Sequence, residues 1–73
     1  MSVSIAKEAQ PRAQCALKQS PILDLRHVQV EHVDDALFIS GSVSSFYHKQ
    51  LAQEIVRAVA NGASVVNSIS VES

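Results

Sequence analysis

Histidine and cysteine are the nitrogen and sulfur ligands that a zinc site in this sequence would use, so their spacing is the first test of function. His27, His32 and His48 match no zinc-ligand spacing, and His27 and His32 lie five residues apart on a predicted strand, facing opposite sides. We interpret them as solvated residues and expect no metal. Cys15 is the only cysteine, so the chain cannot be a disulfide-stapled miniprotein.

Carboxylates and hydroxyls could serve acid–base or nucleophilic catalysis. Asp34 and Asp35 are adjacent in a predicted turn, and nothing in the sequence indicates the burial that would raise a carboxyl pKa. Ser44 and Ser45 lie near His48, but they precede a predicted helix and lack the glycines of a nucleophile elbow. An N-cap role is favoured for them. We therefore expect neither an enzyme nor a cofactor.

The composition of the chain further narrows the classes of protein to which it could belong. The 73 residues suit one domain, and 47% hydrophobic with 18% charged residues is typical of a globular fold. A net charge of −1 gives no basic field for phosphates, so a nucleic-acid partner is not expected. No apolar run is long enough to span a membrane, and residues 1–14 lack the apolar region of a signal peptide. The chain is either cytoplasmic as written or part of a longer exported protein.

Periodicity and turn signals predict the elements that must position any site. Strict alternation indicates the strands, a row at i, i+4 and i+8 indicates the main helix, and Ser20-Pro21 and Asn61-Gly62 end the two helices. In chain order we expect a flexible segment 1–10, a helix 11–19, an apolar connector 22–25, a strand 26–33, a strand 36–43, a helix 46–60 and a strand 64–71.

This order, α-β-β-α-β, predicts an α+β fold within a single domain, residues 11–73. The first two strands form a hairpin, and the helical crossover makes the third strand parallel to the second. Two helices then pack on one face of a three-stranded mixed sheet. The expected core is Val28, Val30, Leu37, Ile39, Val43, Leu51, Ile55, Val56, Val59, Val65, Ile69 and Val71.

The face that the helices leave open is the first candidate contact surface. On this face we place Phe38, Val66 and Ala36, flanked by His27. Phe46 and Tyr47, at the start of the main helix, are a second candidate, although at least one of them is expected to pack against the helix cap.

The assembled pattern resembles the BON domain, a small module of bacterial osmotic-stress and nodulation-related envelope proteins. The matching pieces, spread over residues 12–72, are Val28-x-Val30, Leu37-x-Ile39-x-Gly41-x-Val43, a helix containing Ala52 and Val59, and Val65-x-Asn67-x-Ile69-x-Val71. The chain departs from the family at Asp35, where a glycine is usual, and at Asn61-Gly62, where Gly-Val is usual.

The resemblance implies the same fold and a non-catalytic binding module that associates with phospholipid membrane surfaces or an envelope partner, in a bacterial periplasm. It also makes Gly41, Asn67 and Gly62 structural motif residues. We expect Gly41 to let the main helix or its connection pass close over the sheet. Two alternatives stay open. One is a protein-interaction or homo-oligomerisation module that uses the open sheet face. The other is a KH-like nucleic-acid binder, less favoured because neither glycine loop is GxxG.

Overall fold

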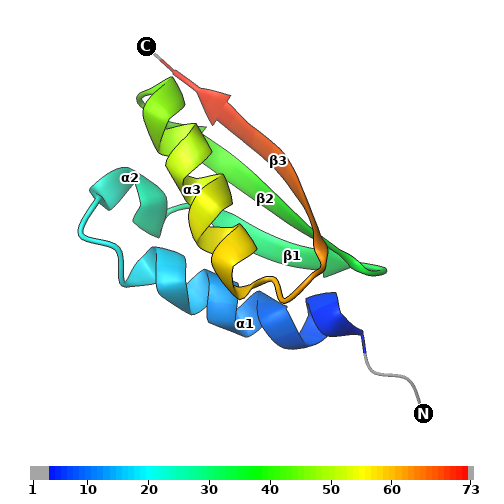
Figure 1. Cartoon of the computed structure of the whole chain (residues 1–73). Helices are drawn as coiled ribbons and strands as arrows, with labels where there is room; N and C mark the ends of the chain where they lie inside the picture. Colours follow the sequence, from blue (N-terminus) through cyan, green and yellow to red (C-terminus); the bar gives the residue numbers. More distant parts are fainter. Residues whose placement is uncertain (1–3, 73) are drawn as a thin grey trace.

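The computed structural model describes residues 4–72 and shows an α+β fold with a three-stranded mixed sheet (Figure 1). The strand order is β1-β2-β3, with β1 antiparallel and β3 parallel to the central strand, which confirms the predicted class and topology. The elements are α1 (Ile5–Lys18), α2 (Leu23–Arg26), β1 (Gln29–Val33), β2 (Ala36–Val43), α3 (Phe46–Val59) and β3 (Ser64–Val71).

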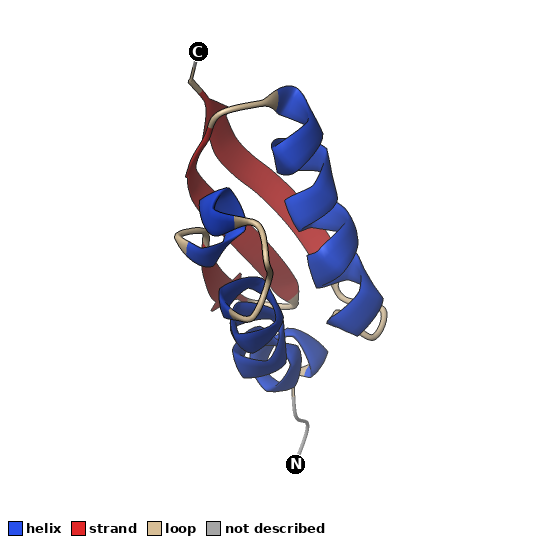
Figure 2. Cartoon of the chain, turned by 90° about the vertical axis from the view of Figure 1, so that its left-hand side faces the viewer, coloured by secondary structure: helices blue, strands red, loops and turns tan. Residues whose placement is uncertain are grey.

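The long helices α1 and α3 lie together on one side of the sheet (Figure 2). The register places Phe38 of β2 between Glu31 of β1 and Val66 of β3, so these three side chains share the face without helices. One end of the molecule carries the β1–β2 turn and the start of α1. The other end carries α2, the start of α3 and the end of β3 (Figure 1).

The first helix begins six residues earlier than predicted, at Ile5 rather than Pro11. Residues 5–10, expected to be loose, form its first turns because Ala6 and Ala9 are buried in the core. Ser4 caps the helix by accepting from the amide of Lys7. The rest of the segment expected to be flexible, residues 1–3, lies outside the described residues.

A short third helix, α2, occupies most of the region predicted as an apolar connector, and the first strand starts at Gln29 instead of Arg26. Helix α2 has no side-chain cap of its own. Leu25 is completely buried in the core, so tertiary packing rather than propensity stabilises this single turn.

Carboxamide side chains bind backbone groups of both edge strands. At β1, Gln14 donates to the carbonyl of Val28, just before the strand, and accepts from the amide of Val30, both at 2.9 Å, while Gln10 donates to the carbonyl of Val30. On β3, the Asn67 oxygen accepts from the amide of Ile69 at 3.1 Å. These contacts occupy groups that would otherwise be available to another strand.

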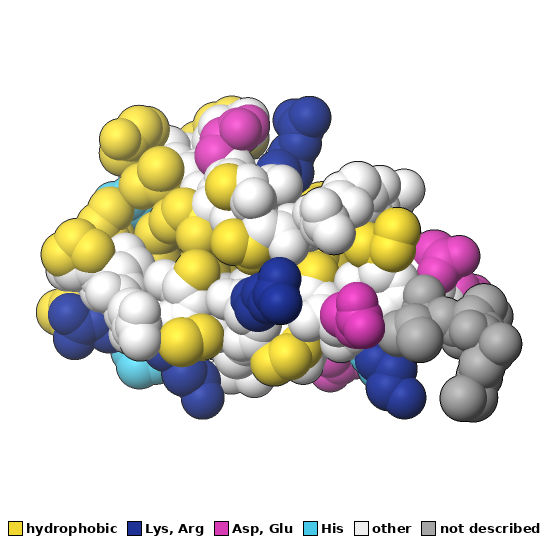
Figure 3. Space-filling model, turned by 60° about the horizontal axis from the view of Figure 1, so that its bottom comes forward, with side chains coloured by type: hydrophobic (Ala, Val, Ile, Leu, Met, Phe, Trp, Pro, Cys, Tyr) yellow, Lys and Arg dark blue, Asp and Glu magenta, His cyan; other side chains and the backbone are white. Residues whose placement is uncertain are grey.

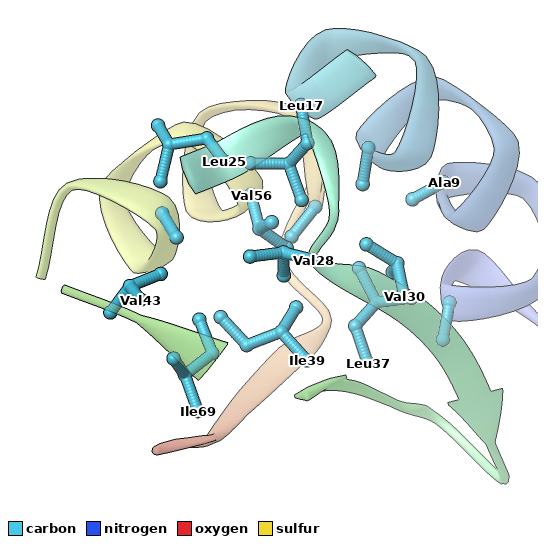
Figure 4. Packing of buried hydrophobic residues seen from close by; sticks show 14 residues of the cluster. Ala9, Leu17, Leu25, Val28, Val30, Leu37, Ile39, Val43, Val56 and Ile69 are labelled. Atoms are coloured by element: carbon cyan, nitrogen blue, oxygen red, sulfur yellow. The ribbon is translucent and has the colours of Figure 1, made fainter. Parts of the chain in front are cut away.

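The core lies between the helices and the sheet (Figure 4). It differs from the predicted list in that Val71 is exposed, while Val65 and the row Leu51, Ile55 and Val59 are only half-buried. The row of α3 that is fully buried is the adjacent one, where small residues let α1 and α3 pack closely. The buried hydrophobic residues are Ala6, Ala9, Ala13, Leu17, Leu25, Val28, Val30, Leu37, Ile39, Val43, Ala52, Val56, Ala60 and Ile69.

Candidate functional site

The open sheet face brings together three of the four residues predicted for a contact surface. Phe38 and Val66 are register partners on neighbouring strands, and Ala36 lies two residues before Phe38 on the same face. Val33, paired with Ala36, extends the group. Val33 and Val66 are exposed and Phe38 is half-buried, so the surface is small and shallow.

His27, the fourth predicted residue, lies elsewhere. It is the C-cap of α2, two residues before Gln29, which pairs with Ser40. The residue that pairs with Phe38 is Glu31, four positions further along the chain than His27, and β1 begins only at Gln29. The face between His27 and Phe38 carries serines of β2 and β3, such as Ser40 and Ser68. His27 thus lies before the start of β1, and its flanking role stays a prediction.

A larger apolar surface lies at the other end of the molecule. Leu23 of α2, with Phe46 and Tyr47 of α3, exposes 65–69% of each residue, and these three form what we call the α2–α3 patch. Figure 3 shows hydrophobic side chains gathered over this end. The half-buried Leu51 continues the row of Tyr47 one turn along α3.

Neither Phe46 nor Tyr47 packs against the helix cap, contrary to expectation. Polar groups alone make the cap: the Ser45 hydroxyl accepts from the amide of His48 at 3.1 Å, as the sequence predicted. The adjacent Ser44 binds a carboxylate instead. Both aromatic residues are mostly exposed, and the Tyr47 ring lies beside that of His48, with ring centroids 5.9 Å apart.

A hydrogen-bond network fastens α2 to the start of α3. The Asp24 carboxylate accepts from the amide of Ser44 at 2.8 Å, from the Ser44 hydroxyl at 2.6 Å and from His48 Nδ1 at 2.9 Å. Nδ1 carries the proton because an ionised carboxylate only accepts. This Asp24 network fixes α2, which carries Leu23, against the start of α3, which carries Phe46 and Tyr47.

The network also fixes the charge of Asp24. Hydrogen bonds from the Ser44 hydroxyl and amide, followed by the bond from His48, lower the pKa of Asp24 to about 2. Asp24 therefore stays ionised at every pH near neutrality.

The Asp24 network contains serine, histidine and aspartate but does not have the geometry of a catalytic triad. An activated serine donates to the histidine, which is in turn oriented by the aspartate. Here Ser44 and His48 both bind the same oxygen of Asp24. The arrangement is a structural one that connects α2 to the start of α3.

Within residues 4–72, no group of three or more histidine, cysteine or acidic residues could hold a metal ion. Nor does the described chain have a helix both long enough and apolar enough to cross a bilayer. Cys15 lies exposed on α1.

The three motif residues have distinct positions. Gly41 has φ +135°, and a Cβ there would lie 3.4 Å from Cα of Val28. The predicted neighbour of Gly41 was wrong: the segment His27–Val28, which enters β1, passes close to it, rather than α3 or its connection. Gly62, at φ +96°, turns the chain after α3.

Asn67 lies under α3. Its amide donates to the carbonyl of Lys49 at 3.0 Å and to the side chain of Gln53 at 3.1 Å, while its oxygen holds Ile69. One side chain thereby ties the helix to the strand beneath it.

Comparison with known families agrees with this architecture. The BON domain model matches residues 8–73, nearly the whole chain, so the protein belongs to the BON domain family. BON domains are binding modules. A search of curated proteins found no match.

Sequence reasoning missed Leu23 and took Leu51 as core. The sequence did contain a signal for an exposed surface here. The apolar row Tyr47, Leu51, Ile55 and Val59 extends along α3 as far as its first turn. A stripe that continues to the end of a helix without a partner leaves its last residues exposed.

Proposed function

We propose that this chain binds phospholipid membrane surfaces without catalysis, and that the α2–α3 patch is the contacting surface. The observation that carries the proposal is the exposure of Leu23, Phe46 and Tyr47 together at one end of the molecule. Tyrosine and other large apolar side chains favour the interface between water and lipid, where an apolar body and a polar tip are both accommodated.

The expected affinity is modest. Fully burying one large apolar side chain is worth about 1.5–3 kcal/mol, so transferring the exposed part of three gives roughly 3–6 kcal/mol. This is comparable to a single myristoyl chain, which binds membranes reversibly with a constant of about 10⁴ M⁻¹. Binding is thus transient unless the module is attached to another anchor or repeated.

Liposome co-sedimentation tests the proposal. The triple variant Leu23→Ser/Phe46→Ser/Tyr47→Ser should lose binding, because it removes the apolar area while leaving the core unchanged. The matched control is Val33→Ser/Val66→Ser on the open sheet face, which should bind as well as the unmodified chain. Equal binding by the triple variant would overturn the proposal.

A second candidate function, protein docking on the open sheet face, is supported by the adjacency of Phe38, Val66 and Val33. The partner in this case is another protein or a second copy of the chain. Sedimentation velocity over a range of concentrations tests self-association, which Val66→Ser should weaken. A chain that stays monomeric at every concentration would exclude the homo-oligomer.

A further inference from the structure

The two edges of the sheet differ in how far their backbone groups are occupied. On β1, the outward-pointing amide and carbonyl of Val30 are bound by Gln14 and Gln10 of α1. On the other edge, the amide of Glu72, directly after β3, donates to the carbonyl of Val43 in β2 at 2.8 Å. Because the backbone groups of a strand alternate in direction, the even-numbered residues of β3 turn theirs toward β2. The odd-numbered residues of β3 therefore turn theirs toward the free edge.

Most of this free edge of β3 is open. The amide of Ile69 donates to the side chain of Asn67, but the backbone groups of Val65 and Asn67 have no partner among residues 4–72. Strand β3 runs for eight residues without a charged residue, a proline or a break in its register, and Figure 1 shows it along the outer side of the molecule. These are the features by which edge strands usually avoid pairing, so their absence leaves β3 as a template for another strand.

The open backbone groups fit a second copy of the same strand. In an antiparallel pair with a twofold axis at Val66, Val65 lies opposite Asn67 of the second copy, and Asn67 lies opposite its Val65. Every amide and carbonyl in these two residue pairs then has a partner, and the occupied amide of Ile69 is not used. An axis at Ser68 instead would place Asn67 opposite Ile69, whose amide is already bound. The Asn67 side chain thus favours the register centred on Val66.

The side chains at this axis are also self-complementary. Val66 would face Val66 of the second copy in a non-hydrogen-bonded pair, where the Cα atoms lie about 4.5 Å apart. Val66 is 39% exposed and lies beside Phe38 on the open sheet face, so the pairing covers apolar surface. Because β3 contains no charged residue, two identical strands meet without repulsion between opposite side chains.

We propose that two copies of this chain pair through their β3 strands, antiparallel about Val66, and so join their sheets into one. The long helices of both copies then lie on the same face of the joined sheet. The α2–α3 patch lies at the end of the molecule where β3 ends (Figure 1). Antiparallel pairing therefore places the two patches at opposite ends of the dimer and leaves them uncovered.

Cysteine cross-linking of the full chain tests the register. In Cys15→Ser/Val66→Cys, the two introduced thiols face each other at a Cα spacing that suits a disulfide. Mild oxidation should therefore convert this variant to a covalent dimer. The control, Cys15→Ser/Ser40→Cys, carries its thiol on the central strand of the same sheet face and should stay monomeric over the same time. Equal cross-linking of the two variants, or none in either, would contradict the proposed pairing.

A charge exchange at the same position gives an independent test. Val66→Lys and Val66→Glu each place like charges opposite one another across the axis. Each variant alone should self-associate at least about fivefold more weakly than the unmodified chain in sedimentation velocity. An equimolar mixture of the two should recover the association, because opposite charges then meet. Ser40→Lys is the control and should associate like the unmodified chain, and circular dichroism checks that every variant is folded.

The outcomes separate the edge of β3 from the open sheet face. Equal weakening by Val66→Lys and Ser40→Lys would assign the association to the face and overturn pairing through the edge. A mixture that does not recover would overturn the axis at Val66. An unmodified chain that stays monomeric at every concentration would overturn the dimer itself.

Discussion

At the scale of single residues, Gly41 is the position where the sheet least accommodates a side chain. Its φ of +135° lies in a region that is almost restricted to glycine. Gly41→Ala should therefore destabilise the fold by about 1–3 kcal/mol in urea unfolding. An unchanged midpoint would contradict this.

Gly62 is the matched control for the close contact at Gly41. Both glycines have positive φ, but nothing lies within 4 Å of a Cβ at position 62. At position 41, Gly→Val should thus cost more stability than Gly→Ala, because the segment His27–Val28 leaves no room for the larger side chain. At position 62 the two substitutions should cost about the same. A similar alanine-to-valine difference at both positions would refute the contact as a cause.

Asp24 should give the fold an acid-sensitive contribution. Its pKa is held at about 2 by the bonds from Ser44 and His48, against about 4 in an unfolded chain. A depressed pKa stabilises the fold fully above pH about 4, and this stabilisation disappears as the pH falls through about 2.

Comparing unmodified protein with Asp24→Asn isolates that contribution. The difference in free energy of unfolding should be constant near neutral pH and should shrink between pH about 4 and about 2. If the two proteins lost stability in parallel over that range, Asp24 would not be the responsible group.

At the scale of elements, side chains on α1 protect the edge of β1. Gln14→Ala leaves the carbonyl of Val28 and the amide of Val30 without their partner, which should cost about 1–3 kcal/mol. Amide exchange at Val30 should also accelerate. Gln19→Ala, on an exposed position just after α1, is the control and should change neither quantity.

The elements show where sequence reasoning succeeds. Strand β2 was predicted to the residue and β3 likewise, because alternation is strict and Asp34-Asp35 and Asn61-Gly62 bound the two strands. Helix α2 was not predicted, because one turn held by the burial of Leu25 carries no periodic signal. The start of α1 was missed because the burial of Ala6 and Ala9 depends on tertiary packing, in which α1 contacts both α3 and β1.

At the scale of the whole molecule, the fold class, the topology and the family were predictable, whereas the most exposed apolar surface was only partly so. Phe46 and Tyr47 were recognised as candidates. Leu23 joins them only through the Asp24 network, which links residues 20 or more positions apart in the sequence. Contacts across such separations depend on tertiary packing, so they cannot be predicted from local sequence patterns.

Tyr47 offers the most direct test of the central claim, because it is the only tyrosine in a chain without tryptophan. The intrinsic fluorescence of the unmodified protein therefore reports on the α2–α3 patch alone. On adding phosphatidylcholine vesicles, this emission should become protected from an aqueous quencher and sensitive to brominated lipid. Emission that stays fully accessible to the aqueous quencher, while the protein co-sediments with the vesicles, would contradict the assignment of this surface.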